Sequence, residues 1–305
     1  MKPLLKWALG LCLLSTSLCC WGLVWVNFES VREGYEGYLE TQGPAPAPTT
    51  NLGVVLLPPQ TPPEAARHHE WRVEALRPPD YQVGYGLSAA MAQHYARDLQ
   101  DYAQSLRYRS LEDDRFSFRA PPGCERLPMA CVYTQLMRSN AKAVHALGER
   151  FVARVRSQGL SAPQAADLIV TFVQGIRYEV PDEQPFGVLP PALVPAQGRG
   201  DCDSKALLAA MLLHQVGIDA VVLSSERLGH AALGVGLPGP GTHFELDGRR
   251  YRYAEVTAAG WPIGMMPPKY DLPRLWTVLP VAHGVSPLGP QVGESEEDAA
   301  NRLAP

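Results

Sequence analysis

The sequence predicts an α+β protein in which helices come first and β-strands follow. Before Tyr178, apolar residues recur at intervals of three and four, the spacing of one face of a helix. After Tyr178 come short β-branched runs, and Asp247-Gly248 separates two of them as in a two-residue hairpin. Of the 305 residues, 46% are apolar and 19% charged, which suffices for a core and excludes a disordered polymer.

The chain begins with a predicted membrane anchor. Residues 7–26 are apolar and uncharged, and a helix of this length, rising about 1.5 Å per residue, covers a hydrocarbon core of about 30 Å. Lys2 and Lys6 precede the stretch, so the positive-inside rule places the N-terminus in the cytoplasm. We expect 1–28 to be a cytoplasmic N-terminus and a single transmembrane helix in the cytoplasmic (inner) membrane, with the remaining chain outside the cytoplasm. A cleaved signal peptide is the alternative, although its apolar core is normally shorter.

Prolines and apolar periodicity divide the rest of the chain. Prolines crowd the stretch between residues 43 and 63, which predicts a semi-extended Pro-rich spacer over 29–66. We expect 67–160 to be an N-terminal helical part of the ectodomain and 161–286 to be its core. Residues 287–305 are acidic and lack apolar periodicity, so they are expected to form a flexible acidic tail.

Local signals define individual helices and strands. One apolar stripe runs from Leu87 to Leu106, a second runs from Val144 to Val155 and stops near Gly159, and a third helix opens at Ser161. The hairpin joins the runs 242–246 and 249–256. In its register we expect two favourable cross-strand pairs, Glu245 with Arg250 and Phe244 with Tyr251.

Three cysteines lie outside the predicted anchor. Cys124 and Cys131 flank a short proline-containing turn in an expected oxidising compartment, so they form a disulfide or remain two separate reduced thiols. Cys202 has no partner in either case. An odd thiol in an exported domain is a candidate reactive group, whereas an isolated buried cysteine is inert by default.

Three segments supply a thiol, an imidazole and a carboxylate, carried by Cys202, His230 and Glu255. They read GRGDCDSK (198–205), LGHAAL (228–233) and YAEVT (253–257). Asp201 is expected to cap a helix that begins at Cys202, which places the thiol at the positive end of that helix. An imidazolium nearby would favour the thiolate further, so we expect the pKa of Cys202 to fall from about 8.5 toward about 3.5–7.5. His230 is the candidate base, and Glu255 would hold its ring in the useful tautomer.

In this order and spacing the segments resemble the bacterial transglutaminase-like superfamily, over about residues 165–268. The resemblance implies a papain-like or transglutaminase-like core, in which a central helix carrying the cysteine packs on an antiparallel sheet. It implies that Cys202 is the nucleophile, His230 the base and Glu255 the orienting acid, where eukaryotic transglutaminases often have Asp. Gln197 is a candidate for assisting the oxyanion because it is close in sequence, together with the backbone N–H of Cys202.

Other kinds of site are not expected. Asp201 and Asp203 lack the further oxygen ligands of a calcium loop, and no zinc pattern occurs, so we expect no metal and no cofactor. His214 and His243 are interpreted as structural. The net charge of −4 and the pI of about 6.1 argue against a nucleic-acid partner.

The resemblance leads us to expect a membrane-anchored, extracytoplasmic cysteine peptidase or amidase that cleaves a peptide or amide bond through a thioester. Its partner would be a peptide or protein substrate in the cell envelope. One alternative is an acyl transferase that cross-links proteins, with an amine in place of water. Another is a catalytically silent scaffold that binds a peptide or an envelope protein. Residues 184–197 and 261–268 would form the subsites, and they leave the substrate open.

Overall fold

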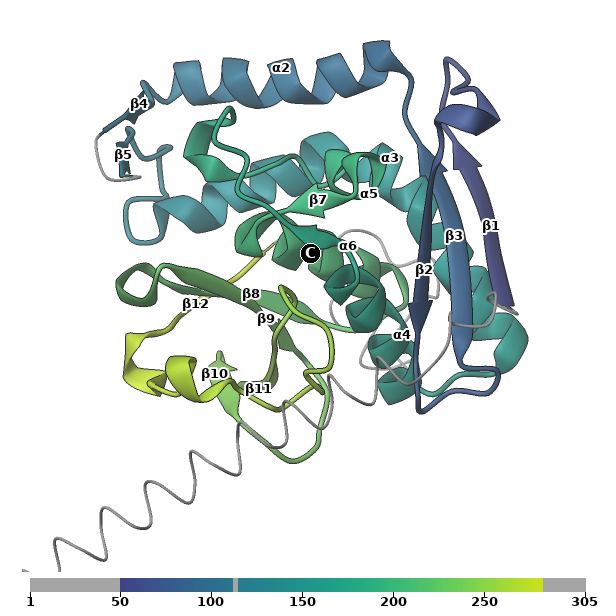
Figure 1. The fold of residues 1–305 in the computed structure, drawn as a ribbon. Helices are drawn as coiled ribbons and strands as arrows, with labels where there is room; N and C mark the ends of the chain where they lie inside the picture. Colours follow the sequence, from purple (N-terminus) through teal and green to yellow (C-terminus); the bar gives the residue numbers. More distant parts are fainter. Residues whose placement is uncertain (1–49, 112–114, 282–305) are drawn as a thin grey trace, which may run out of the picture. The chain divides into compact units, whose positions relative to one another are not determined.

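The computed structural model describes residues 50–111 and 115–281, and these form an α+β fold, as expected (Figure 1). The predicted transmembrane helix and the predicted acidic tail lie outside the described residues. Within the described ranges, no helix combines the length and the hydropathy that crossing a membrane requires.

The predicted helices are present. The Oγ of Ser88 accepts the Met91 N–H at 3.3 Å and starts α2, and the N–H of Ser161 reaches the Gln164 side chain at 3.0 Å before α4. α3 ends at Gly159, whose φ of 59° lies in the left-handed region that glycine enters without strain. The α-helices are α2 (Ala89–Ser105), α3 (Pro128–Gln158), α4 (Ala162–Gln174), α5 (Leu193–Gln197) and α6 (Cys202–Gln215). The 3₁₀ turns are η1 (Pro63–Ala65), η2 (Pro185–Gly187), η3 (Glu226–Leu228), η4 (Pro268–Tyr270) and η5 (Pro273–Leu275).

A five-stranded sheet, with strand order β10-β11-β9-β8-β12, is antiparallel throughout. Its hairpin has the predicted register, because Phe244 pairs with Tyr251 and Glu245 with Arg250. The strands are β8 (Ala220–Ser225), β9 (His230–Val235), β10 (His243–Leu246), β11 (Arg249–Ala254) and β12 (Thr277–Leu279). Two short pairs accompany it: β4 (Arg109–Ser110) with β5 (Phe116–Ser117), and β6 (Arg177–Tyr178) with β7 (Arg199–Gly200).

A second sheet corrects two of the predicted boundaries. β1 (Thr50–Leu56) runs parallel to β3 (Asp80–Gly86), and β2 (Arg67–Arg72) pairs with β3 in the antiparallel sense. The spacer predicted over 29–66 is therefore wrong from residue 50 onward, and the part predicted as helical over 67–160 opens with two strands. The reason is physical: Leu52 and Val55 are buried core residues, and the later prolines of this stretch lie in the connection between β1 and β2.

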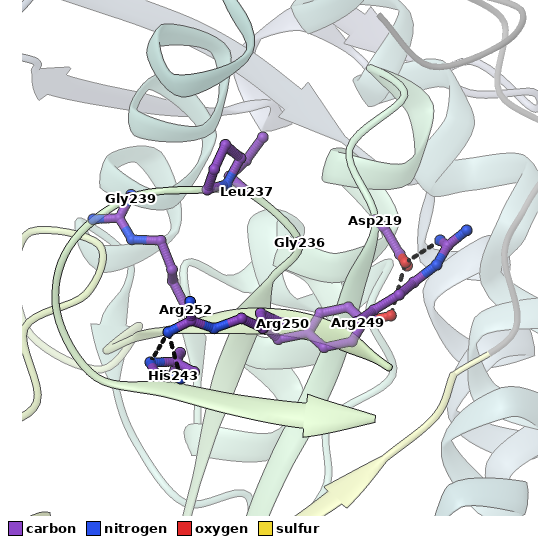
Figure 2. A pocket seen from close by; sticks show the side chains of 10 residues that line it. Asp219, Gly236, Leu237, Gly239, His243, Arg249, Arg250 and Arg252 are labelled. Carbon is purple, nitrogen blue, oxygen red and sulfur yellow. Dashed lines mark hydrogen bonds and ion pairs between the residues drawn. The ribbon is translucent and has the colours of Figure 1, made fainter. Parts of the chain in front are cut away.

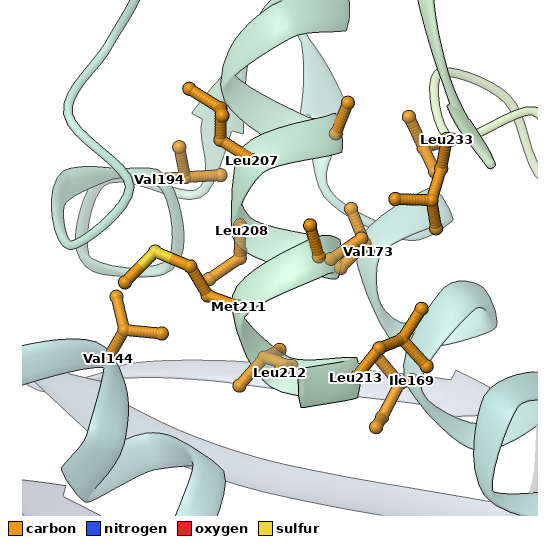
Figure 3. Close-up of a cluster of buried hydrophobic side chains, with 14 of the residues drawn as sticks. Val144, Ile169, Val173, Val194, Leu207, Leu208, Met211, Leu212, Leu213 and Leu233 are labelled. Atoms are coloured by element: carbon orange, nitrogen blue, oxygen red, sulfur yellow. The ribbon is translucent and has the colours of Figure 1, made fainter. Parts of the chain in front are cut away.

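α6 lies at the centre of the main core, with α3, α4 and α5 on its sides and β8 and β9 beneath it (Figure 1). Every residue of α6 except Asp203 is buried, which explains why its sequence is apolar on all sides. Figure 3 shows its leucines among side chains of these neighbours, including Val144, Ile169, Val194 and Leu233. The opposite face of the sheet carries a second apolar cluster that includes Tyr253, Met266 and Trp276.

The far end of α6 fits closely against α3 at a glycine. A Cβ at Gly148 would lie 2.1 Å from Oε1 of Gln215, so only glycine leaves room for this amide. The amide is held there by His145, whose Nδ1 lies 3.0 Å from Oε1, and by the carbonyl of Val144, 3.4 Å from Nε2. This contact sets how near the two helices lie.

Candidate active site

Cys202 opens α6, as the sequence predicted. Asp201 caps the helix, because its Oδ1 accepts the N–H of Ser204 at 3.0 Å and the Ser204 hydroxyl as well. The N–H of Cys202 belongs to the first turn, where no earlier helical carbonyl can accept it. The Cys202 residue is only 6% exposed, so the sulfur lies at the base of the site rather than on the surface.

The sulfur has two polar neighbours. Its S–H points to Oδ2 of Asp203 at 3.6 Å, and the backbone N–H of Ala231 donates a hydrogen bond to it. The other oxygen of Asp203 accepts the hydroxyl of Tyr133, which comes from α3. Because Ala231 directly follows His230, this contact holds the thiol beside the start of β9.

The electrostatics of the thiol differ from the expectation. Burial raises the pKa of Cys202, and the carboxylates of Asp203 and Asp201 raise it further, against the opposing hydrogen bond from Ala231. The prediction of a thiol ionised by its helix terminus is therefore wrong, because two acids flank it within the first turn. Burial, followed by the charge of Asp203, also raises the pKa of Asp201 to about 7. At neutral pH the resting thiol keeps its proton.

His230 and Glu255 form the second half of the site. Nε2 of His230 lies 3.0 Å from Oε2 of Glu255, and both residues are buried. The Nδ1 atom has no hydrogen-bond partner within the described chain, so it is the ring nitrogen left for chemistry. Among these same residues no hydrogen bond joins the imidazole to Cys202. The sulfur of Cys202 contacts Asp203 and the N–H of Ala231 instead.

Glu255 is fixed by three further donors. The Tyr253 hydroxyl donates to Oε2 at 2.9 Å, and Thr257 donates to Oε1 through its N–H at 2.9 Å and its hydroxyl at 2.6 Å. Burial works to raise the pKa of Glu255. The hydrogen bond and the positive charge of a protonated His230, followed by the two hydrogen bonds from Thr257, outweigh burial and lower the pKa to about 2. The carboxylate therefore stays charged and keeps its orientation.

An aromatic cover lies over the imidazole. The ring of Tyr270 stacks on His230 with centroids 4.0 Å apart and planes 14° from parallel, and Trp276 meets the imidazole edge-on at 6.0 Å. The indole Nε1 of Trp276 donates to the Tyr270 carbonyl at 3.0 Å, which holds the η4 turn in place. This cover explains why His230 is buried although it lies at the first position of β9.

A buried lysine ties the segments of the site together. Lys205, one turn after Cys202, points its Nζ at the carbonyls of Ile176 (2.5 Å) and Thr257 (3.4 Å). Burial lowers the pKa of Lys205 to about 8, although the charge of Glu255 acts in the other direction. The amide of Gln174 adds a second link, since it donates to the Glu255 carbonyl at 2.8 Å. The helix of the thiol and the strand end of the acid are thus joined through one cation and one amide.

Other predicted residues have different surroundings. Gln197 ends α5, and its Oε1 accepts Nε of Arg199 at 2.9 Å, while no hydrogen bond joins it to Cys202 in the described residues. His214 is buried with its Nε2 3.1 Å from the Ala220 carbonyl, as a structural histidine would be, whereas His243 is exposed beside Arg250.

The cysteine pair and the possible metal ligands complete the set. Cys124 and Cys131 form a disulfide, the first of the two alternatives, with Cα atoms 6.2 Å apart. Asp201, Cys202 and Asp203 are the described side chains that could hold a metal ion, with ligand atoms within 4.8 Å of one another. Both carboxylates already accept hydroxyl hydrogen bonds, and we assign no metal to them.

Some residues of the site escaped the sequence prediction. Thr257 and Lys205 lie in the motifs themselves, and their spacing of two from Glu255 and three from Cys202 could have indicated contact with the site. Tyr133 and Tyr270 come from distant segments, and no local pattern marks them. Comparisons of the chain with protein-family models, with curated proteins and with solved structures found no match.

Proposed function

We propose that the protein is a cysteine hydrolase of the transglutaminase-like type, which cleaves a peptide or amide bond through a thioester on Cys202. One observation carries the proposal: the thiol at the head of α6 contacts the residue after His230, and His230 is held by the charged Glu255. A nucleophile, a base and an orienting acid are the parts that covalent acyl chemistry needs.

The proposed reaction starts from the neutral thiol. His230 takes the S–H proton at Nδ1 as the sulfur attacks the substrate carbonyl, and Glu255 stabilises the imidazolium that forms. The proton passes to the amine as the C–N bond breaks, which leaves a thioester. Water then attacks the thioester, loses a proton to His230, and releases the acid while the thiol is protonated again. The N–H of Cys202, which no earlier carbonyl of α6 can accept, supports the oxyanion in both steps.

The setting of the enzyme is part of the proposal. We place it on the outer side of the inner membrane, anchored by residues 7–26, with a peptide or protein of the cell envelope as substrate. The Cys124–Cys131 disulfide supports an oxidising compartment, where such bonds persist. An acyl transferase would share every residue and differ only in the acceptor, so added amines and product analysis separate the two.

A catalytically silent scaffold is the second candidate, and the buried thiol, protonated and hydrogen-bonded to Asp203, favours it. The test exposes the purified full chain to cell-envelope extract and searches Cys202 for acyl adducts by mass spectrometry. The enzyme predicts an adduct in the wild type and in the matched control His94→Gln, at an exposed position of α2, and none in His230→Gln. Absence of the adduct, together with rescue of a deletion strain by Cys202→Ala, would establish the scaffold.

A further inference from the structure

A cavity of about 460 Å³ opens at the end of the five-stranded sheet farthest from the candidate active site. It is bordered by Asp219 before β8, by the loop that follows β9 from Gly236 to Gly239, and by side chains of β10 and β11. Ala220 pairs with Val235 at this end of the sheet, whereas Ser225 pairs with His230 at the other. At about 3.3 Å per residue, the length of β9 separates the cavity from the imidazole by roughly 17 Å.

The side chains around this cavity carry an excess of positive charge. Arg249, Arg250 and Arg252 line it with His243, and Asp219 is the acid among the lining residues. Figure 2 shows Arg249 directed toward Asp219 and Arg250 toward His243. Three guanidinium groups against one carboxylate concentrate positive potential in a concave site, on a chain whose net charge is −4.

Asp219, the acid among the lining residues, already accepts hydrogen bonds from two of its neighbours. Oδ2 of Asp219 accepts Nη1 of Arg249 at 3.0 Å and the Tyr251 hydroxyl at 2.8 Å. Arg250 contacts the ring of His243, with Nη2 2.8 Å from Nδ1, rather than a carboxylate. Glu245, which faces Arg250 across the hairpin, forms no ion pair with it in the described part of the chain.

Arg252 is held by two backbone carbonyls, and the carboxylate of Asp167 is close enough for the charge of Arg252 to lower the pKa of this carboxyl group, against the effect of burial. Nε of Arg252 donates to the Pro240 carbonyl at 3.0 Å, and Nη2 donates to the Ile263 carbonyl. Glycines make room for the group: a Cβ at Gly239 would lie 2.7 Å from Nη1, and one at Gly264 would lie 2.7 Å from Nη2. The other N–H groups of the Arg252 guanidinium have no hydrogen-bond partner within the described residues. A guanidinium fixed in this way loses little conformational entropy when it binds an oxyanion through two parallel (bidentate) hydrogen bonds.

We propose that this cavity binds an oxyanion ligand that carries two or more negative charges, on a phosphate group or on several carboxylate groups. Arg252 supplies the fixed donors and Arg250 swings from His243 to complete the clamp. The volume falls in the range of small-molecule sites, about 300–1,000 Å³. Since the cavity lies at the opposite end of β9 from His230, the proposal stands whether or not the protein is a hydrolase.

Isothermal titration calorimetry of the full chain tests the proposal with three probes: inorganic phosphate, citrate and a tetraglutamate peptide. The first two represent a free small anion, and the third represents an acidic peptide. We expect saturable binding of at least one probe, weakened about tenfold in Arg250→Gln and in Arg252→Gln. Added salt should weaken the binding as well, because it screens the charges.

The exposed Arg138 on α3 provides the matched control, since Arg138→Gln removes the same charge elsewhere. Arg250 is also exposed, so its variant keeps the test valid if Arg252→Gln fails to fold. Binding unchanged in Arg250→Gln, an equal loss in Arg138→Gln, or no saturable binding with any probe would each overturn the proposal.

Discussion

Oε2 of Glu255 lies 3.0 Å from Nε2 of His230, and this contact directs the other ring nitrogen, Nδ1, away from the acid. A histidine held by one nitrogen has a defined tautomer and one free position for proton transfer.

The acid should contribute stability that depends on pH. The pKa of Glu255 is lowered to about 2 from its ordinary value of 4.5, so its stabilisation is complete above pH 4.5 and is lost as the pH falls toward 2. Unfolding of the wild type and of Glu255→Gln by urea should show their free-energy difference shrinking over that window by about 3 kcal/mol. The exposed Glu226→Gln serves as control, and a difference independent of pH would contradict the assignment.

Lys205 should contribute a second pH dependence, in the alkaline range. Its pKa is lowered to about 8 from 10.5, so the unfolded chain binds the proton more tightly between these values. The wild type should therefore gain stability relative to Lys205→Met as the pH rises from 8 to 10.5, by about 3 kcal/mol. Lys142→Met, on the exposed face of α3, should give no such trend. A flat difference for Lys205→Met would mean that the amine is solvated.

Asp203 should suppress ionisation of the thiol. Replacing it with Asn removes a negative charge 3.6 Å from the sulfur, which lowers the pKa of Cys202. Alkylation of Cys202 by iodoacetamide, followed by mass spectrometry as a function of pH, should shift to lower pH by at least about one unit. The exposed Asp101→Asn should leave the profile unchanged. An unaltered profile in Asp203→Asn would refute this role.

Tyr270 should limit access to the site. Its ring covers His230 at 4.0 Å, so Tyr270→Ala should accelerate alkylation of Cys202 on the order of tenfold and loosen the imidazole. Tyr270→Phe keeps the stacked ring and should behave like the wild type. Equal rates in the two variants would show that the aromatic face is not what closes the site.

Much of this arrangement follows from local sequence. The cap at Asp201, the helix from Cys202 and the hairpin register rest on signals a few residues long, and all three are present in the fold. The strand β1 escaped prediction because nearby prolines resemble those of a linker until the parallel partner, β3, is known. The thiol pKa was predicted with the wrong sign, since helix position is local whereas burial depends on the whole core.

Gly148 has a consequence for the sulfur it never touches. A methyl group at this position would collide with the amide of Gln215 and break its hydrogen bonds at the last turn of α6. Because α6 is buried along its whole length, a displacement of its last turn would also shift its first turn. The position of the Cys202 thiol at the first turn of α6 therefore depends on the absence of a side chain at Gly148, beside the last turn of the same helix.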